Sequence, residues 1–178
     1  MEWDGEATEL TPPVGERDHA RGPAGAAATL VVYGDYECPY TRRAHQTLRE
    51  VQAELGDRLR VVYRHFPLTA IHPHALHAAE AAEAAAAQGR FWEMHDRLFS
   101  RQLDLADTDL GDYAADLGLD VAAFTRDMSE HAHLARVEED VESGLRSGVE
   151  GTPTLFLNGR RHGGGFEKEA LLVAVGGG

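Results

Sequence analysis

The chain has one cysteine, Cys38, and its sequence context is typical of a reactive thiol. It follows a short apolar run and directly precedes Pro39, a residue suited to the first turn of a helix. The unpaired N–H groups and partial positive charge at a helix N-terminus stabilise a thiolate, which is the nucleophilic form of cysteine. We therefore predict that Cys38 is a nucleophile open to solvent, with Pro39 and Tyr40 shaping the loop around it.

A second segment with chemical meaning lies more than 100 residues further on, at Gly151-Thr152-Pro153. Proline is tolerated at the first residue of a strand, where no ladder hydrogen bond is needed, and a cis peptide there would turn the chain sharply. Such a turn leaves the Thr152 backbone free to pair with an extended peptide. We expect Thr152 and Pro153 to hold a bound partner.

The hydrophobic pattern predicts the elements that must position these two segments. Strands are expected at 28–33 and 58–66 with a helix from Pro39 to Leu55 between them, which implies parallel pairing of the two strands. Five helical patterns follow up to about residue 145, and Asn158-Gly159 indicates a hairpin before a last helix. The predicted order is β-α-β, a helical block, then β-β-α.

Composition excludes several classes of function. With 17 Lys+Arg against 30 Asp+Glu in 178 residues, the net charge is −13, which argues against binding to nucleic acid or anionic membranes. One cysteine rules out an internal disulfide and a cysteine-based zinc site. No run of 18 apolar residues occurs, and Met1 to Leu10 lack the features of a secretion signal. We expect a cytoplasmic monomer that does not insert into membranes.

Together these motifs resemble the DsbA-like branch of the thioredoxin superfamily. The resemblance covers Asp18 to Val175 and rests on residues 33–40, on His-Phe-Pro-Leu at 65–68 and on residues 151–159. It is especially close to the thioredoxin-like domains fused to NhaA-type antiporters. The resemblance implies an α/β thioredoxin-like fold in 28–71 and 148–178, with an all-helical insertion at 72–147 after an irregular, acidic and Pro/Gly-rich lead-in at 1–27.

The sequence departs from the Cys-x-x-Cys motif of this family at Thr41, which replaces the second cysteine. The resemblance therefore implies thiol–disulfide exchange through one nucleophile, Cys38, acting on protein or small-molecule disulfides. Such a monothiol enzyme needs another thiol, such as glutathione, to resolve its mixed disulfide. Thr41 either donates its hydroxyl to the Cys38 sulfur or is a surface residue of a degenerate motif.

Two other functions fit the same residues. The chain could be a redox-inactive peptide-binding module that has lost catalysis with its second cysteine. It could also be a glutathione-using transferase or isomerase similar to the kappa-type enzymes.

The ten histidines invite a metal site, which we do not expect. Pro73 directs His72 and His74 apart, and His74 and His77 share one helix face, so these side chains do not converge tetrahedrally. The same expectation holds for His131 and His133, which we assign to helix entry and the solvated surface. We predict no bound metal or cofactor.

Overall fold

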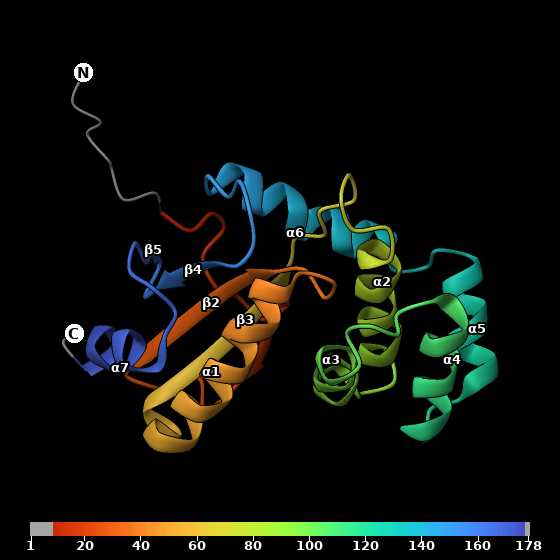
Figure 1. The fold of residues 1–178 in the computed structure, drawn as a ribbon, viewed down its shortest axis with the longest axis horizontal. Helices are drawn as coiled ribbons and strands as arrows, with labels where there is room; N and C mark the ends of the chain where they lie inside the picture. The colour runs from red at the N-terminus through yellow and green to blue at the C-terminus, as the bar shows by residue number, and fades with distance from the viewer. Residues whose placement is uncertain (1–8, 177–178) are drawn as a thin grey trace.

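The computed structural model describes residues 9–176 and places a five-stranded sheet at one end of the molecule (Figure 1). The strands lie in the order β1-β3-β2-β4-β5. Their bounds are His19–Arg21 for β1, Ala28–Gly34 for β2, Leu59–His65 for β3, Thr154–Leu157 for β4 and Arg160–Arg161 for β5. β2 and β3 are parallel, as predicted, whereas the other three pairs are antiparallel.

Both faces of the sheet are covered, because alternate residues of the central strand β2 enter different cores. Leu30 and Val32 pack in the core that includes α1, Pro39–Leu55, and α7, Lys168–Gly176. Val31 and Tyr33 pack on the opposite face with residues of the N-terminal segment and of α6. The near-continuous apolar sequence of β2 follows from this burial on both sides.

The helical insertion stands beside the sheet and returns to it (Figure 1). Its helices are α2, Ala75–Ala86; α3, Phe91–Ser100; α4, Asp107–Asp116; α5, Val121–Ser129; and α6, Leu134–Arg146. The alanines of α2 let the neighbouring helices approach closely. α6 is fastened to the sheet by a hydrogen bond of 2.8 Å between Ser143 Oγ and Tyr33 Oη, and by Asp140 Oδ2, which accepts from the His65 amide at 3.0 Å.

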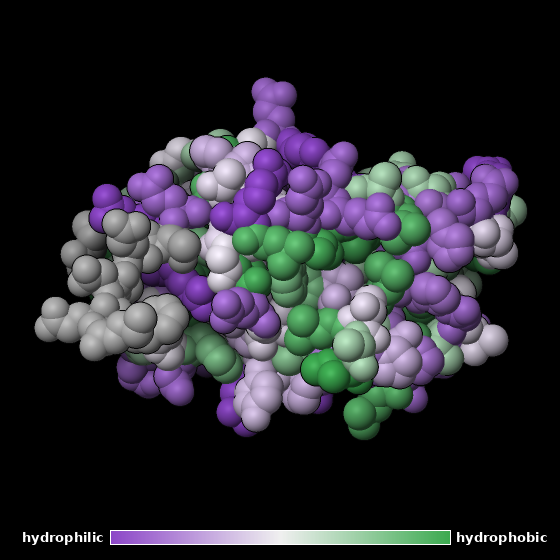
Figure 2. All heavy atoms as spheres, turned by 90° about the horizontal axis from the view of Figure 1, so that it is seen from above, coloured by the Kyte–Doolittle hydropathy of each residue, from purple (hydrophilic) through white to green (hydrophobic). Residues whose placement is uncertain are grey.

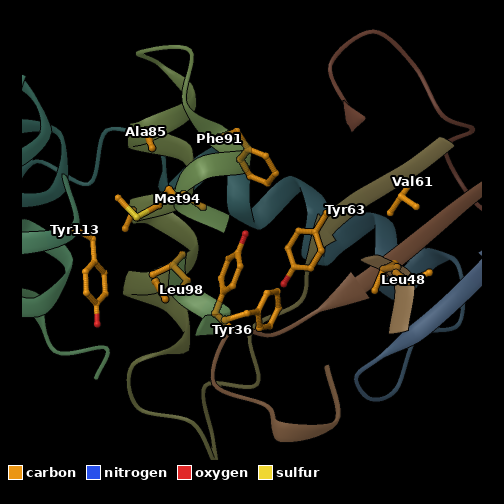
Figure 3. Packing of buried hydrophobic residues seen from close by; sticks show 14 of the residues in the cluster. Tyr36, Leu48, Val61, Tyr63, Ala85, Phe91, Met94, Leu98 and Tyr113 are labelled. Carbon is orange, nitrogen blue, oxygen red and sulfur yellow. The ribbon is translucent and has the colours of Figure 1, made fainter. Parts of the chain in front are cut away.

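Aromatic side chains join the insertion to the sheet. Figure 3 shows Tyr36 and Tyr63 side by side between the sheet and α3, close to Phe91 and Leu98. The ring centroids of Tyr36 and Tyr63 lie 5.2 Å apart. The two parts of the chain therefore share one continuous apolar core.

The predicted helices and strands are confirmed, with shifts of a few residues at their ends. Asp120 caps α5 as expected, since its Oδ1 accepts from the Ala123 amide at 3.0 Å. The expectation of an irregular lead-in at 1–27 is wrong for its later part, because β1 pairs antiparallel with β3 there. Residues 1–8 of that lead-in lie outside the described residues. Within residues 9–176, no helix has the length and apolarity needed to cross a bilayer.

Candidate active site around Cys38

Cys38 lies where the chain leaves β2 and begins α1. It is the N-cap residue of the helix, with Pro39 in the first turn. The Cys38 amide donates to the Asp35 carbonyl at 3.1 Å, and the Cys38 carbonyl accepts from the Arg42 amide at 3.1 Å. Among residues 9–176, the Cys38 side chain makes no capping hydrogen bond to an amide of the first helical turn. The sulfur therefore belongs to a residue at the positive end of the helix, as the sequence predicts.

The Gly151-Thr152-Pro153 segment lies directly beside Cys38. The Cys38 thiol donates to the Thr152 carbonyl oxygen, with 3.6 Å between sulfur and oxygen, and the Thr152–Pro153 peptide bond is cis. The sheet explains this meeting, because β4 pairs antiparallel with β2 and Thr154 lies opposite Tyr33. The end of β2 and the start of β4 therefore share one edge of the sheet. The Thr152 hydroxyl oxygen is buried and finds no hydrogen-bond partner among the described residues.

The sulfur is less open than the sequence analysis expects. Cys38 is only 4% exposed, whereas Pro39 is exposed and Tyr40 is 60% exposed. Thr152 and Pro153 are half-buried beside it. The expectation of a sulfur open to solvent is therefore wrong, because the loop before β4 covers the thiol. A partner must enter beside this loop to reach the sulfur.

Apolar side chains are exposed around this edge of the molecule. Figure 2 shows apolar residues gathered near the middle of the face that lies above the view of Figure 1. Besides Tyr40, Ile71 is 67% exposed, and it lies in the loop that follows β3. That loop is bonded to Asp35 through the Leu68 amide, so the exposed Tyr40 and Ile71 side chains belong to the two segments that adjoin Cys38.

Thr41 occupies the place of the second motif cysteine and is buried. Its hydroxyl oxygen accepts from the Asp35 amide at 3.4 Å. Its methyl group packs at Gly34, where an added Cβ would come within 2.6 Å of Thr41 Cγ2. Thr41 is therefore packed inside the protein and is not the surface residue of the degenerate-motif interpretation. Donation from Thr41 to the Cys38 sulfur remains a prediction.

The buried Asp35 carboxylate holds the loop before Cys38 in place through three hydrogen bonds. This role was not identified from the sequence. The carboxylate accepts from the Glu37 amide at 2.7 Å, the Leu68 amide at 2.8 Å and His72 Nδ1 at 2.8 Å. These bonds fasten the segment after β3 to the segment that carries Cys38. A short Asp-x-Glu spacing before the cysteine is the signal that could have indicated such a turn.

Gln102 is a second positioning residue that sequence reasoning missed. Its buried amide nitrogen donates to the Tyr36 and Cys38 carbonyl oxygens, each at 2.9 Å. A single side chain from the segment after α3 thus holds both ends of the turn before α1. No motif connects residues 64 positions apart, so the sequence carried no signal for this contact.

Two buried tyrosines lie behind the site. Burial raises the pKa of Tyr36 and of Tyr63 well above 10.0, and nearby negative charges act in the same direction. Both hydroxyls therefore stay protonated and can donate. Tyr36 Oη lies 2.8 Å from His95 Nδ1, whereas Tyr63 Oη has no partner among the described residues.

The histidines considered for a metal pair with separate carboxylates. His72 contacts Asp35, His77 contacts Asp107, His131 contacts Glu80 and His133 contacts Asp127. Within residues 9–176, three metal-ligating side chains converge elsewhere, at His45, His95 and Asp96. His45 lies on α1, 50 positions before the adjacent His95 and Asp96 on α3, which explains why spacing did not reveal the cluster.

Residues 15–175 match the thioredoxin family. The chain belongs to this family. Over 166 residues, the chain is 48% identical to a Na(+)/H(+) antiporter NhaA 1 of Salinispora arenicola. That match covers 93% of this chain and 25% of the antiporter, so the chain spans about a quarter of the length of such curated relatives.

Solved structures show the same fold. A thioredoxin-like oxidoreductase from Silicibacter pomeroyi is 28% identical, with a TM-score of 0.78 over 89% of this chain and 90% of that chain. Alpha-DsbA1 of Wolbachia pipientis is 19% identical, with a TM-score of 0.79 over 92% of each chain. The resemblance to DsbA-like proteins and to NhaA-associated thioredoxin-like domains is thereby confirmed, as is the α/β thioredoxin-like fold.

Proposed function

We propose that this member of the thioredoxin family performs thiol–disulfide exchange through the single thiol of Cys38. The observation that carries the proposal is the position of that sulfur, at the N-cap of α1 and 3.6 Å from the Thr152 carbonyl oxygen. A helix N-terminus stabilises a thiolate, and the adjoining loop offers a place for a partner. The printed description of the S. pomeroyi neighbour as an oxidoreductase supports the same class of reaction.

The reaction conserves electrons at each step. The Cys38 thiolate attacks one sulfur of a disulfide R–S–S–R′, so the S–S bond breaks, a mixed disulfide Cys38–S–S–R forms and R′–S⁻ leaves. A second thiolate of the glutathione class then attacks the R sulfur and releases Cys38 as a thiolate. The products are R′–S⁻ and a disulfide between R and the small thiol. Such thiols are abundant in the reducing cytoplasm, where we propose that the exchange takes place.

We assign the remaining predicted residues, apart from Thr41, to binding. Pro39 and Tyr40 are exposed at the entrance, so they would contact the disulfide partner. The Thr152 segment would pair with an extended peptide, and its unpartnered hydroxyl offers one more polar group to that partner. Thr41 supports the turn from inside through the Asp35 amide.

The proposal is tested by measuring glutathione-dependent reduction of a small mixed disulfide, such as hydroxyethyl disulfide, by the purified chain. We expect turnover that Cys38→Ser abolishes. The matched control combines Cys38→Ser with Ser129→Cys, which restores one thiol at an exposed position at the end of α5. If this control is as active as the wild type, the exchange is uncatalysed thiol chemistry and the proposal is wrong.

A second candidate is a redox-inactive binding module, and two observations favour it. Thr41 replaces the second cysteine, and only 4% of Cys38 is exposed. The variant Thr41→Cys separates the candidates. Activity in that variant together with none in the wild type would identify a module that keeps the peptide-binding segment at Thr152 and has lost catalysis.

A further inference from the structure

We propose that His45, His95 and Asp96 form a binding site for one divalent transition metal ion of the Zn²⁺ class. His45 lies on α1, whereas His95 and Asp96 are neighbours on α3. One ligand atom from each residue lies within 4.8 Å of the other two. The two helices thus bring two imidazoles and one carboxylate together at a place that the proposed thiol chemistry does not use.

The spacing of these atoms suits a metal ion after a small adjustment. His45 Nε2 lies 3.7 Å from Asp96 Oδ1. Bonds of 2.0 to 2.2 Å in tetrahedral geometry place neighbouring ligand atoms about 3.4 Å apart. A pair at the 4.8 Å limit must therefore close by about 1.4 Å, which side-chain rotation supplies.

Neighbouring groups already hold the ligands in orientation. Tyr36 Oη lies 2.8 Å from His95 Nδ1, which leaves Nε2 of that ring for the metal. The His45 ring stacks on Phe99, with centroids 4.7 Å apart and planes 24° apart. Arg21 contacts both Asp96 oxygens at 2.9 Å, so a metal bound to one oxygen leaves the other on the guanidinium. These contacts are the outer support that metal-ligating histidines and carboxylates need.

A small cavity that both histidines line, but Asp96 does not, is the place we assign to a water as the remaining ligand. It has a volume of about 20 Å³, which is room for one water molecule. His45, His95 and Tyr63 are among its lining residues. Tyr63 Oη is buried and has no partner among the described residues, so it can hydrogen-bond to a water in this cavity. Three protein ligands with one water is the arrangement of an open zinc site.

The ligand types select the class of metal. Imidazole and carboxylate suit first-row transition ions, whereas Ca²⁺ and Mg²⁺ prefer sites made wholly of oxygen. Cys38 is seven residues before His45 on the same helix, a rise of about 10 Å along the axis. The thiol is therefore not a ligand of this site.

Co²⁺ added to the chelator-treated full chain provides the probe, because its visible absorption reports ligand type. We expect one saturable ion per chain, with visible d–d absorption bands of a Co²⁺ ion bound by nitrogen and oxygen ligands and no thiolate charge-transfer band. Asp96→Asn and His45→Gln change half-buried residues, and each should weaken binding at least ~10-fold, in line with the cost of perturbing metal ligands. Zn²⁺ should displace the bound Co²⁺.

Two variants serve as controls. His77→Gln removes a histidine outside the cluster, and Cys38→Ser removes the thiol; both should bind Co²⁺ like the wild type. Circular dichroism confirms that each variant is folded. The proposal is overturned by absence of saturable binding in the wild type, by equal binding in His45→Gln, or by loss of binding in Cys38→Ser or His77→Gln.

Discussion

The Cys38 sulfur lies 3.6 Å from the Thr152 carbonyl oxygen, across 114 residues of sequence. This contact joins the start of α1 to the loop before β4, and it leaves Cys38 only 4% exposed. The thiol is therefore shielded by this loop and does not lie on an open surface.

This covering predicts reactivity that depends on the size of the reagent. In the native protein, iodoacetamide should modify Cys38 readily, whereas a bulky maleimide should react at least ~10-fold more slowly than it does with the urea-unfolded chain. Mass spectrometry of timed samples measures both rates. Because Cys38 is the sole cysteine, every adduct reports on it. Equal native and unfolded rates for the bulky reagent would show that the loop does not cover the sulfur.

Gln102→Ala should destabilise the fold through the turn that carries Cys38. The change removes the Gln102 donor from the Tyr36 carbonyl and leaves the Cys38 carbonyl with the Arg42 amide as its donor, at a cost of about 1–3 kcal/mol in the free energy of unfolding. Urea denaturation measures this cost. Gln46→Ala, on the exposed face of α1, is the matched control and should stay within about 0.5 kcal/mol of the wild type. Similar values for the two variants would contradict the assigned contact.

Gly34→Ala should be poorly tolerated because the new methyl group has no space. It would meet Thr41 Cγ2 at 2.6 Å and Tyr63 Cε2 at 2.7 Å, and such overpacking costs about 1–3 kcal/mol. Adding Thr41→Ser removes the clash with Thr41 Cγ2 and should recover part of the loss. Gly25→Ala, with no heavy atom within 4 Å of its new Cβ, is the control for thermal unfolding. A Gly34→Ala protein as stable as that control would refute the packing described here.

The buried Glu83 carboxylate predicts a pH dependence of stability. Burial alone would raise its pKa, but hydrogen bonds and charges from His19 and His65 outweigh burial and hold the pKa well below 4.5. A carboxyl with a lowered pKa in the folded state stabilises the fold above pH 4.5, and this stabilisation is lost as the pH falls through the folded-state pKa.

Glu83→Gln should therefore cost about 3–5 kcal/mol at pH 7, because it breaks the ion pair of the buried Glu83 carboxylate with Arg136 Nε, 3.6 Å away. The difference from the wild type should shrink as the pH falls below 4.5. Urea denaturation across this range measures the effect, with exposed Glu50→Gln as the control. A difference that is independent of pH would contradict the assigned ionisation.

Local sequence patterns were enough to predict most helices and strands. They could not predict side-chain contacts between residues far apart in the sequence. β2, α1 and β3 were predictable because apolar periodicity and the residues Pro39 and Gly56 mark their limits. β1 was missed because three residues are too few to show a period, and its pairing with β3 decides its conformation.

The same division holds for the candidate site. Cys38 and the Thr152 segment were found because each lies in a recognisable local pattern. The burial of the sulfur, the Gln102 contact and the approach of His45 to His95 depend on how α3 packs against α1, and no local pattern encodes that packing.

The Gln102 amide donates to the carbonyls of Tyr36 and Cys38, on both sides of Glu37. The position of the Cys38 nucleophile therefore depends on the position of the helical insertion. If the end of α3 tilts, the cysteine travels with it and its distance from the opposing loop changes. A ligand bound between α1 and α3 would therefore change the distance between the Cys38 sulfur and the loop before β4 without contacting the sulfur.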